Sequence, residues 1–541
     1  MKMNRFIYPV DTCDFASIRE AGKVYVDKTD LIYRLVSTYN YVFLDRPRRF
    51  GKSLLCSTFK AYFNGNSKLF DGLRIAELEK EWRKYPVFHF SMSGLKDLTL
   101  EDAKTKLGNY IEDYEQIYGR NEKEVTPGAR FRGLIHRAAA QTGEKVVVII
   151  DEYDAPIMRL LHQKERMEVI RSMLREFYQV LKDEDEYIRF VFLTGITKFS
   201  QLSIFSELNN LKNISAMPEY SGLCGITQNE LDTTLRPCVE DFAEGYGCTT
   251  DEAYALLRKQ YDGYHFCGNS QDVYAPFSLL NALSDKAIND YWFTGATPTT
   301  LIDHLRHYPI ASAIEYDGVD VNLGQFYIPC EDAPTPMPLL YQSGYLSIDT
   351  YDKRLNSYRL HFPNQEVRNG MVDCLMPIIL HRSTADNNAL VLEMARAIYN
   401  GDLATALLHL RAYIAAMPYD IMPEAEWADK QKREWFYKLL FYLVFSTLNT
   451  KVDTEVRSIL GRADVVIQTE DDVFVIELKE DHSVKNALDQ IDRQDYAIRW
   501  EANGRRVTKC GVRIGSDRRN ITHFKLTDAE GRKIVERKFN K

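Results

Sequence analysis

Residues 41–55 read YVFLDRPRRFGKSLL. A short apolar strand is followed by a polar loop, by Gly51-Lys52-Ser53, and by apolar residues at helical spacing. This order is typical of a phosphate-binding loop, in which backbone N–H groups and a helix N-terminus surround a polyphosphate. Lys52 is expected to reach the β- and γ-phosphates of ATP, and the Ser53 hydroxyl to bind Mg²⁺. The predicted ATP contacts are Arg48, Arg49, Phe50, Gly51, Lys52, Ser53 and Leu54.

One position departs from the usual pattern G-x-x-x-x-G-K-[ST], because Arg46 stands in the place of the first glycine. A side chain at this place restricts positive φ angles and crowds the turn. The alternative to nucleotide binding is a basic loop that only caps the helix.

A second stretch favours the ATP site. Residues 145–150, KVVVII, are typical of a parallel strand buried on both faces, and Asp151 and Glu152 follow it. In P-loop NTPases an acid at this strand end holds Mg²⁺, and the next Glu suits a base that orients the attacking water. Thr194 ends a third strand and is expected near the γ-phosphate, with a simple Thr-Gly turn as an equal alternative.

Composition sets the outer limits. The 541 residues suggest about three domains, and 45% hydrophobic with 27% charged residues is typical of a folded protein without membrane spans. The N-terminus lacks the apolar core of a signal peptide, and the nine scattered cysteines indicate neither a disulfide framework nor a zinc site. A cytoplasmic location is therefore expected. The net charge of -8 argues against a chain that coats nucleic acid along its whole length.

The order of elements predicts three parts. Strands alternate with helices through residue 225, which indicates a parallel α/β domain; a short strand is expected at 24–29. Residues 226–385 are interpreted as a helical lid and a small mixed subdomain. Residues 386–541 contain a long helix and two or more strands that form a second α/β domain.

The second chemical centre is a predicted hairpin in this last part. Asp464 lies in one strand and Glu477-Leu478-Lys479 in the next, so Glu477 and Lys479 share a face. Asp464 and Glu477 can converge on Mg²⁺ or Mn²⁺, which prefer oxygen ligands, and Lys479 can hold or deprotonate a water. Either Glu434 or Glu455 could complete the metal shell. The alternative is an edge hairpin with a surface Glu–Lys pair.

With both centres in hand, the chain resembles AAA-ATPase-like proteins fused to a PD-(D/E)XK nuclease-superfamily domain. The similarity rests on these segments: YVDKTDLI (25–32), RPRRFGKSLL (46–55), VVVIIDEYDAPI (146–157), TGITKFS (194–200), YDGYHF (261–266), YAPFSLLNAL (274–283), YWFTGATPTTL (291–301), SGYLSI (343–348), FPNQEVR (362–368), GRADVVI (461–467), VFVIELK (473–479) and ALDQI (487–491).

The resemblance implies an AAA-type core, a lid and a restriction-endonuclease-like domain. It implies ATP and Mg²⁺ contacts at Lys52, Ser53, Asp151 and Glu152. It also implies a nuclease triad of Asp464, Glu477 and Lys479, with Gln490 on the following helix. Ala463 stands where the proline of the motif's name is expected.

The leading hypothesis is an ATP-binding, ATP-hydrolysing switch that controls a metal-dependent DNA or RNA nuclease, in defence or mobile-element biology. A homo-oligomer is compatible with this role. The main rival is a nucleotide switch whose last domain binds nucleic acid or a partner without cleaving it. A third reading keeps the ATPase and makes the last domain structural.

Overall fold

The computed structural model describes residues 5–96, 98–198, 210–293, 299–305, 307–308, 316–330, 333–380, 384–417, 427–446, 451–457, 462–497, 500 and 504–539. The chain divides into two compact units, Met1–Val367 and Arg368–Lys541. None of the described helices is both long enough and apolar enough to pass through a bilayer.

The N-terminal unit is built on a five-stranded parallel sheet, as the sequence predicts. Its strands are β1 (Tyr41–Asp45), β2 (Val87–Ser91), β3 (Val146–Asp151), β4 (Ile188–Gly195) and β5 (Lys212–Asn213), in the order β2-β3-β4-β1-β5. Strands β1 and β3 are buried along their whole length, which explains their continuous apolar runs. Because all strands run in parallel, the polar residues that follow them gather at one edge of the sheet.

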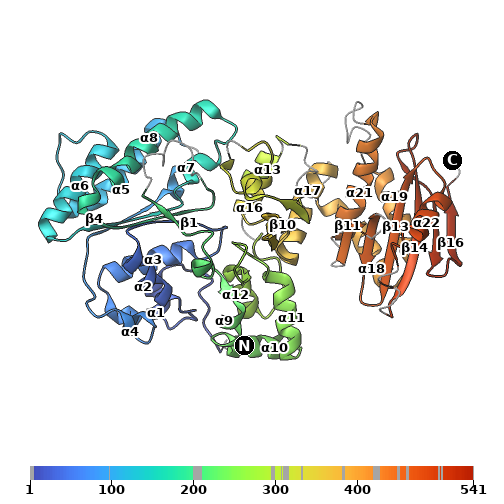
Figure 1. Cartoon of the computed structure of the whole chain (residues 1–541), viewed down its shortest axis with the longest axis horizontal. Helices are drawn as coiled ribbons and strands as arrows, with labels where there is room; N and C mark the ends of the chain where they lie inside the picture. The colour runs from blue at the N-terminus through green and yellow to red at the C-terminus, as the bar shows by residue number, and fades with distance from the viewer. Residues whose placement is uncertain are drawn as a thin grey trace. The chain divides into compact units, whose positions relative to one another are not determined.

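Helices cover both faces of this sheet, with α3 on one face and α6 and α8 on the other (Figure 1). The helices of this part are α1 (Phe15–Glu20), α2 (Thr29–Thr38), α3 (Lys52–Phe63), α4 (Ile75–Leu78), α5 (Leu100–Tyr118), α6 (Pro127–Thr142), α7 (Ala155–Met158) and α8 (Lys164–Asp183). The strand expected at 24–29 is wrong. The segment leads into α2 without joining a described sheet, and Val24 N–H donates only to the Ile7 carbonyl.

A helical group and a small sheet complete the N-terminal unit. The helices α9 (Gln228–Asp232), α10 (Arg236–Tyr246), α11 (Thr250–Tyr261) and α12 (Pro276–Asp285) share one apolar core. Thr227 with Glu230, and Thr249 with Glu252, form capping boxes that start α9 and α11. The remaining elements are β6 (Ile226–Thr227), β7 (Val273–Tyr274), α13 (Thr299–Leu305), β8 (Val319–Val321), α15 (Leu323–Phe326), α16 (Met337–Gln342), β9 (Ser347–Asp352) and β10 (Ser357–His361).

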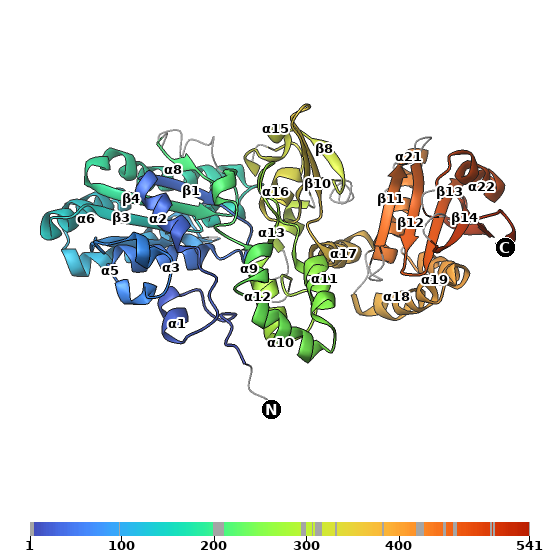
Figure 2. The ribbon, with the colours of Figure 1, turned by 60° about the horizontal axis from the view of Figure 1, so that its bottom comes forward.

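The C-terminal unit holds a six-stranded mixed sheet in sequence order, and Figure 2 shows β11 to β14 side by side. Its strands are β11 (Lys451–Arg457), β12 (Arg462–Gln468), β13 (Asp472–Glu480), β14 (Arg506–Gly515), β15 (Asn520–Asp528) and β16 (Lys533–Lys538). Only the β13–β14 pair is parallel. The helices are α17 (Gln365–Leu380), which begins before the division, α18 (Thr384–Tyr399), α19 (Leu403–Ala415), α21 (Lys430–Ser446) and α22 (Val484–Arg493). Helix α21 packs on β11–β13 and α22 on β13 and β14. The expected α/β fold class is confirmed.

Candidate functional site

The loop after β1 forms the turn that the sequence predicts. Gly51 precedes α3 with a φ of 86°, a left-handed conformation that a glycine adopts without strain. The first N–H groups of α3, from Lys52 onward, have no partner within the helix, as at any helix start, so they can bind an anion. Arg49 also has a positive φ, 65°, whereas Arg46 does not. The first left-handed residue of the loop is thus Arg49, three residues after Arg46, where the usual pattern has its first glycine.

Lys52 is held by the loop itself. Its Nζ atom donates to the carbonyl oxygens of Arg46, at 2.9 Å, and of Pro47, at 2.8 Å. Burial lowers the pKa of Lys52, and the nearby carboxylate of Asp151 opposes this shift. The ammonium group is therefore already desolvated and placed inside the loop.

The two residues expected to hold Mg²⁺ lie together. Ser53 Oγ donates to Asp151 Oδ2 at 2.6 Å, and Glu152 N–H donates to Asp151 Oδ1 at 2.9 Å. The next acid, Glu152, has a φ of 51° and contacts Lys96 Nζ through Oε2 at 2.9 Å. The hydroxyl and carboxylate oxygens of Ser53 and Asp151 are ligands that suit Mg²⁺. The donor set therefore fits the expected cation.

Arg46 is part of the core rather than of the phosphate-binding surface. Its guanidinium donates to the carbonyls of Asp45 and Ser215, both at 2.9 Å, and to that of Tyr220 at 3.4 Å. The same group lies 4.0 Å from the ring centre of Phe266. The side chain that replaces the first glycine thus points away from the loop interior, so it does not fill the phosphate space.

The neighbouring residues contribute differently. Arg48 is exposed, whereas the Arg49 guanidinium donates to the carbonyls of Tyr291 and Trp292, at 2.6 and 2.9 Å. The Phe50 ring is buried in edge-to-face contact with aromatic residues. Arg49 and Phe50 therefore fasten the loop to the rest of the unit, and their ATP contacts stay a prediction.

A narrow apolar cavity of about 100 Å³ lies beside the loop, next to Gly51 and Leu54. Its other walls come from segments far apart in the sequence, among them Tyr25, Val26, Ile32, Leu223, Ile226, Pro276 and Leu280. Its position next to the first turn of α3 suits the apolar face of a nucleotide base.

Thr194 and Asp154 lie at the ends of the central strands. The Thr194 hydroxyl donates to the Leu44 carbonyl at 2.7 Å and is fully buried, so its contact with the γ-phosphate stays a prediction. Sequence reasoning missed Asp154, which accepts hydrogen bonds from the N–H groups of Ile196 and Thr197 and from the Thr197 hydroxyl, at 2.8–2.9 Å. This carboxylate connects the turn after β3 to the end of β4. The last acid of the run DEYD was the only sequence signal for it.

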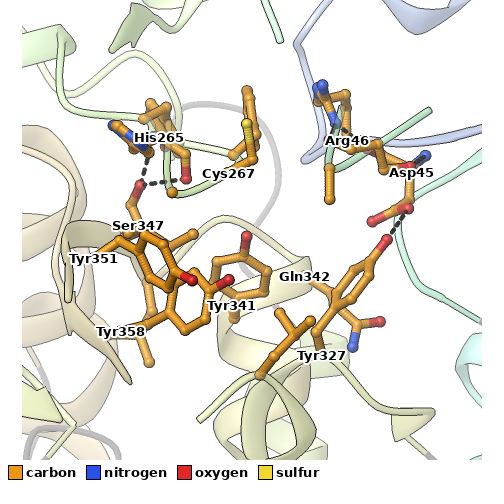
Figure 3. Close-up of a pocket in the computed structure, with 18 of the residues that line it drawn as sticks. Asp45, Arg46, His265, Cys267, Tyr327, Tyr341, Gln342, Ser347, Tyr351 and Tyr358 are labelled. Atoms are coloured by element: carbon orange, nitrogen blue, oxygen red, sulfur yellow. Dashed lines mark hydrogen bonds between the residues drawn. The ribbon is translucent and has the colours of Figure 1, made fainter. Parts of the chain in front are cut away.

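A larger pocket of about 320 Å³ opens behind the loop, and sequence reasoning missed it as well (Figure 3). The Tyr327 hydroxyl donates to Asp45 Oδ1 at 2.9 Å across this pocket. Pro47 is one of the pocket's walls and packs against Gly344, which has a φ of 87°; a Cβ atom built on Gly344 would lie 2.6 Å from Pro47 Cβ. The other labelled walls are Arg46, His265, Cys267, Tyr341, Gln342, Ser347, Tyr351 and Tyr358.

In the C-terminal unit, the hairpin β12–β13 brings the predicted acids together. Asp464 lies next to the last antiparallel pair, Val465 with Ile476, so Glu477 is its neighbour across the strands. Asp464 Oδ2 accepts from Leu478 N–H at 2.8 Å, which fixes one carboxylate. Both acids are nearly inaccessible, at 6% and 1% exposed. The sequence therefore places two carboxylates side by side at a buried point of the sheet.

Two lysines neutralise this pair. Lys479 Nζ contacts Glu477 Oε1, and Lys438 Nζ contacts Asp464 Oδ1, both at 2.8 Å. Burial, with the charge of Asp464, raises the pKa of Glu477 to about 7. Burial also raises the pKa of Asp464, against the pull of Lys438. The second oxygen of Glu477, Oε2, is buried and has no hydrogen-bond partner among the described residues.

This unpartnered oxygen is the observation that tests the expected metal. A buried carboxylate oxygen without a partner is costly, and Mg²⁺ or Mn²⁺ would satisfy it together with Asp464. The donor atoms therefore fit a hard divalent cation. Sequence reasoning did not assign Lys438, from α21, to this site, although it is the one charged residue of the apolar run 435–445.

The remaining predicted residues surround this point. Gln490, on α22, donates to the Tyr496 hydroxyl at 3.3 Å. With Glu434 and Lys479 it lines an open groove of about 760 Å³. Glu434 Oε1 lies 3.8 Å from Lys438 Nζ. Glu455 belongs to β11, but its side chain lies outside the described residues.

Comparisons with known proteins match one family in each of the two units. Residues 9–205 match the family described as "Predicted AAA-ATPase", and residues 432–524 match the PD-(D/E)XK nuclease superfamily. A protein of Azotobacter chroococcum mcd 1, named "Uncharacterized protein in vnfD 5'region", is 34% identical over 534 residues. The match covers 96% of this chain and 99% of that protein.

Proposed function

Because the chain belongs to the family of predicted AAA-ATPases that carry a PD-(D/E)XK nuclease-superfamily domain, we propose that it is an ATP-hydrolysing switch controlling a metal-dependent nuclease. The substrate would be the phosphodiester bond of DNA or RNA. The observation that carries the proposal is the pair Asp464–Glu477, with Lys479 beside it and the buried Glu477 Oε2 without a described partner. A structural hairpin gives no reason to bury two adjacent acids.

At the nuclease site, each of the predicted residues would have a separate role. Asp464 and Glu477 would hold the cation through their carboxylate oxygens. Lys479, held against Glu477, would orient the attacking water or offset charge on the phosphate. A bound Mg²⁺ or Mn²⁺ supplies Lewis acidity and lowers the pKa of water. Gln490 lies in the same groove, where it would contact the nucleic-acid backbone or the water.

At the ATP site, Lys52 and the first N–H groups of α3 would bind the phosphates. Ser53 and Asp151 would hold Mg²⁺, which offsets phosphate charge when bound. Glu152 would orient the attacking water after leaving Lys96. The apolar cavity next to Leu54 would take the base. Hydrolysis would then change how the loop is held by Arg49 and Phe50.

We assign the ATP-binding core to residues 1–225, the lid with the small mixed subdomain to 226–385, and the nuclease-like domain to 386–541. We place the protein in the cytoplasm, with nucleic acid as its partner; a homo-oligomer is compatible with this role. Defence against foreign DNA is the setting that we propose, by analogy with the family.

One observation favours a second candidate function. Lys438 already contacts Asp464 at 2.8 Å, so an ammonium group occupies part of the space that a metal requires. A domain in which this contact persists would bind nucleic acid or a partner without cleaving it. The ATP-binding unit would then act as a nucleotide switch for binding.

The first experiment measures cleavage of labelled single- and double-stranded DNA and RNA with Mg²⁺ or Mn²⁺, with and without ATP. Glu477→Gln removes the metal-binding charge, and Lys52→Ala removes the phosphate-binding charge. The matched control is Glu470→Gln, an exposed acid in the turn of the same hairpin. Cleavage lost only in Glu477→Gln supports the nuclease, and ATP dependence lost in Lys52→Ala supports the switch. Cleavage unchanged in Glu477→Gln would contradict the assignment, and no cleavage by any protein would favour the second candidate.

A further inference from the structure

Three side chains that can bind a metal meet beneath the phosphate-binding loop. Cys56 comes from the second turn of α3, His89 from β2 and Asp151 from the end of β3. Their ligand atoms, one sulfur, one nitrogen and one oxygen, all lie within 4.8 Å of one another. The proposed function uses only Asp151, so it gives no reason for this thiol and imidazole to lie beside it.

Cys56 and Asp151 are buried, and His89 is half-buried. Cys56 is 0% exposed, and His89 Nε2 is buried with no hydrogen-bond partner among the described residues. The backbone of His89 is fixed, because its N–H donates to the Tyr114 hydroxyl at 2.8 Å and its carbonyl accepts from the same hydroxyl at 3.1 Å. A buried imidazole nitrogen without a partner has lost its hydration and gained nothing in return. A metal ion would supply the missing partner.

The chemical types of the three ligand atoms indicate which metal ion the site would bind. A thiolate, an imidazole and a carboxylate together suit Zn²⁺, whereas Mg²⁺ takes oxygen ligands only. Bond lengths of about 2.0–2.3 Å around a tetrahedral Zn²⁺ place its ligand atoms roughly 3.3–3.7 Å apart. The observed upper limit of 4.8 Å is therefore about 1 Å too wide, a difference that side-chain rotation can close. Water would fill the fourth position.

We propose that Cys56, His89 and Asp151 form a Zn²⁺ site that competes with the ATP site for Asp151. Binding releases the Cys56 thiol proton to solvent, since the thiolate is the ligand. It also draws the Asp151 carboxylate away from the Ser53 hydroxyl, now 2.6 Å distant. The regulatory part of the proposal rests on the proposed ATP site, whereas the metal site itself does not.

The test uses the full metal-free chain and Co²⁺ as a probe for Zn²⁺. Co²⁺ bound to a thiolate gives a charge-transfer absorption band, which oxygen ligands at the nuclease-like site cannot produce. We expect one equivalent of Co²⁺ to develop this band and one equivalent of Zn²⁺ to remove it. Cys56→Ala should abolish the band, and His89→Gln should weaken Co²⁺ affinity at least tenfold.

Cys238→Ala is the matched control, because Cys238 is also a buried cysteine on a helix, in α10. A band that survives in Cys56→Ala, or that disappears equally in Cys238→Ala, would overturn the site. Adding Mg²⁺ and ATP should weaken Co²⁺ binding at least tenfold in the wild-type chain, but not in Lys52→Ala. An unchanged affinity would overturn the competition. Because the band needs no ATP, failure of the ATP site would be recognised separately by a direct ATP titration.

Discussion

Replacing Arg46 by glycine restores the usual P-loop pattern, yet we expect the protein to become less stable. The substitution removes two hydrogen bonds of 2.9 Å to the carbonyls of Asp45 and Ser215. These contribute about 1 kcal/mol each, and the buried contact with the Phe266 ring contributes about 1–2 kcal/mol. The flexible glycine costs about 0.5–1 kcal/mol more. The free energy of unfolding of the N-terminal unit should therefore fall by about 4 kcal/mol.

Calorimetric melting of the full chain measures this loss. About 4 kcal/mol corresponds to a decrease of roughly 5–10 °C in the Tm of a unit of this size. Arg48→Gly is the matched control, since Arg48 is an exposed neighbour in the same loop. ATP affinity should not improve in Arg46→Gly, because the Arg46 side chain does not enter the phosphate space. An unchanged Tm, or tighter ATP binding, would refute this account of the loop.

Three further predictions concern the nuclease-like site. Because the pKa of Glu477 is raised to about 7 from 4.5, the metal-free protein loses stability as pH rises through this interval. The metal-free Glu477→Gln variant should therefore have a higher Tm than the wild type at pH 8 and the same Tm near pH 4.5. The Mn²⁺ affinity of the wild type should rise from pH 6 to pH 8. Asp464→Asn should lower metal-dependent cleavage at least a hundredfold and leave ATP affinity unchanged. Lys438→Met should tighten Mn²⁺ binding about tenfold, about 1.4 kcal/mol, by removing a competing charge.

Calorimetric titration of Mn²⁺ and of ATP into each variant measures the expected affinities, and cleavage of labelled nucleic acid measures the expected loss of activity in Asp464→Asn. Glu470→Gln again serves as the control for the loss of one carboxylate. A melting difference that does not change with pH would contradict the buried-proton explanation for Glu477. Weaker Mn²⁺ binding in Lys438→Met would mean that the lysine supports the site rather than competing for it. Parallel loss of cleavage and of ATP binding in Asp464→Asn would contradict two separate sites.

Local patterns predict the parts of the fold that depend on short stretches of chain. The apolar run 146–150 leads directly into Asp151, and parallel strands end at one edge of a sheet, so the pattern alone predicts that Asp151 lies near Ser53. The hairpin of Asp464 and Glu477 follows equally from strand alternation. The strand expected at 24–29 is wrong because β-branched residues indicate a strand only when a neighbouring strand is available to pair with it.

Contacts between distant segments could not be predicted in the same way. The partners of Arg46 are Ser215, Tyr220 and Phe266, and no local pattern connects them to residue 46. Lys438 reaches Asp464 from a separate helix. In the sequence, Cys56 and His89 each resemble ordinary core residues. The pairing of β2 with β3 brings His89 beside Asp151, and the packing of α3 on these strands brings Cys56 there. Motifs indicate which atoms are available, whereas tertiary packing decides which atoms meet.

Gly344 lies against Pro47 in the phosphate-binding loop although the two are far apart in the chain. Any side chain at residue 344 has to push Pro47 aside, together with the carbonyl that holds Lys52. A genetic screen for lost nucleotide binding should therefore recover changes at this remote glycine as well as in the loop. Second mutations that shorten the loop or make it more flexible should restore nucleotide binding in some variants of Gly344.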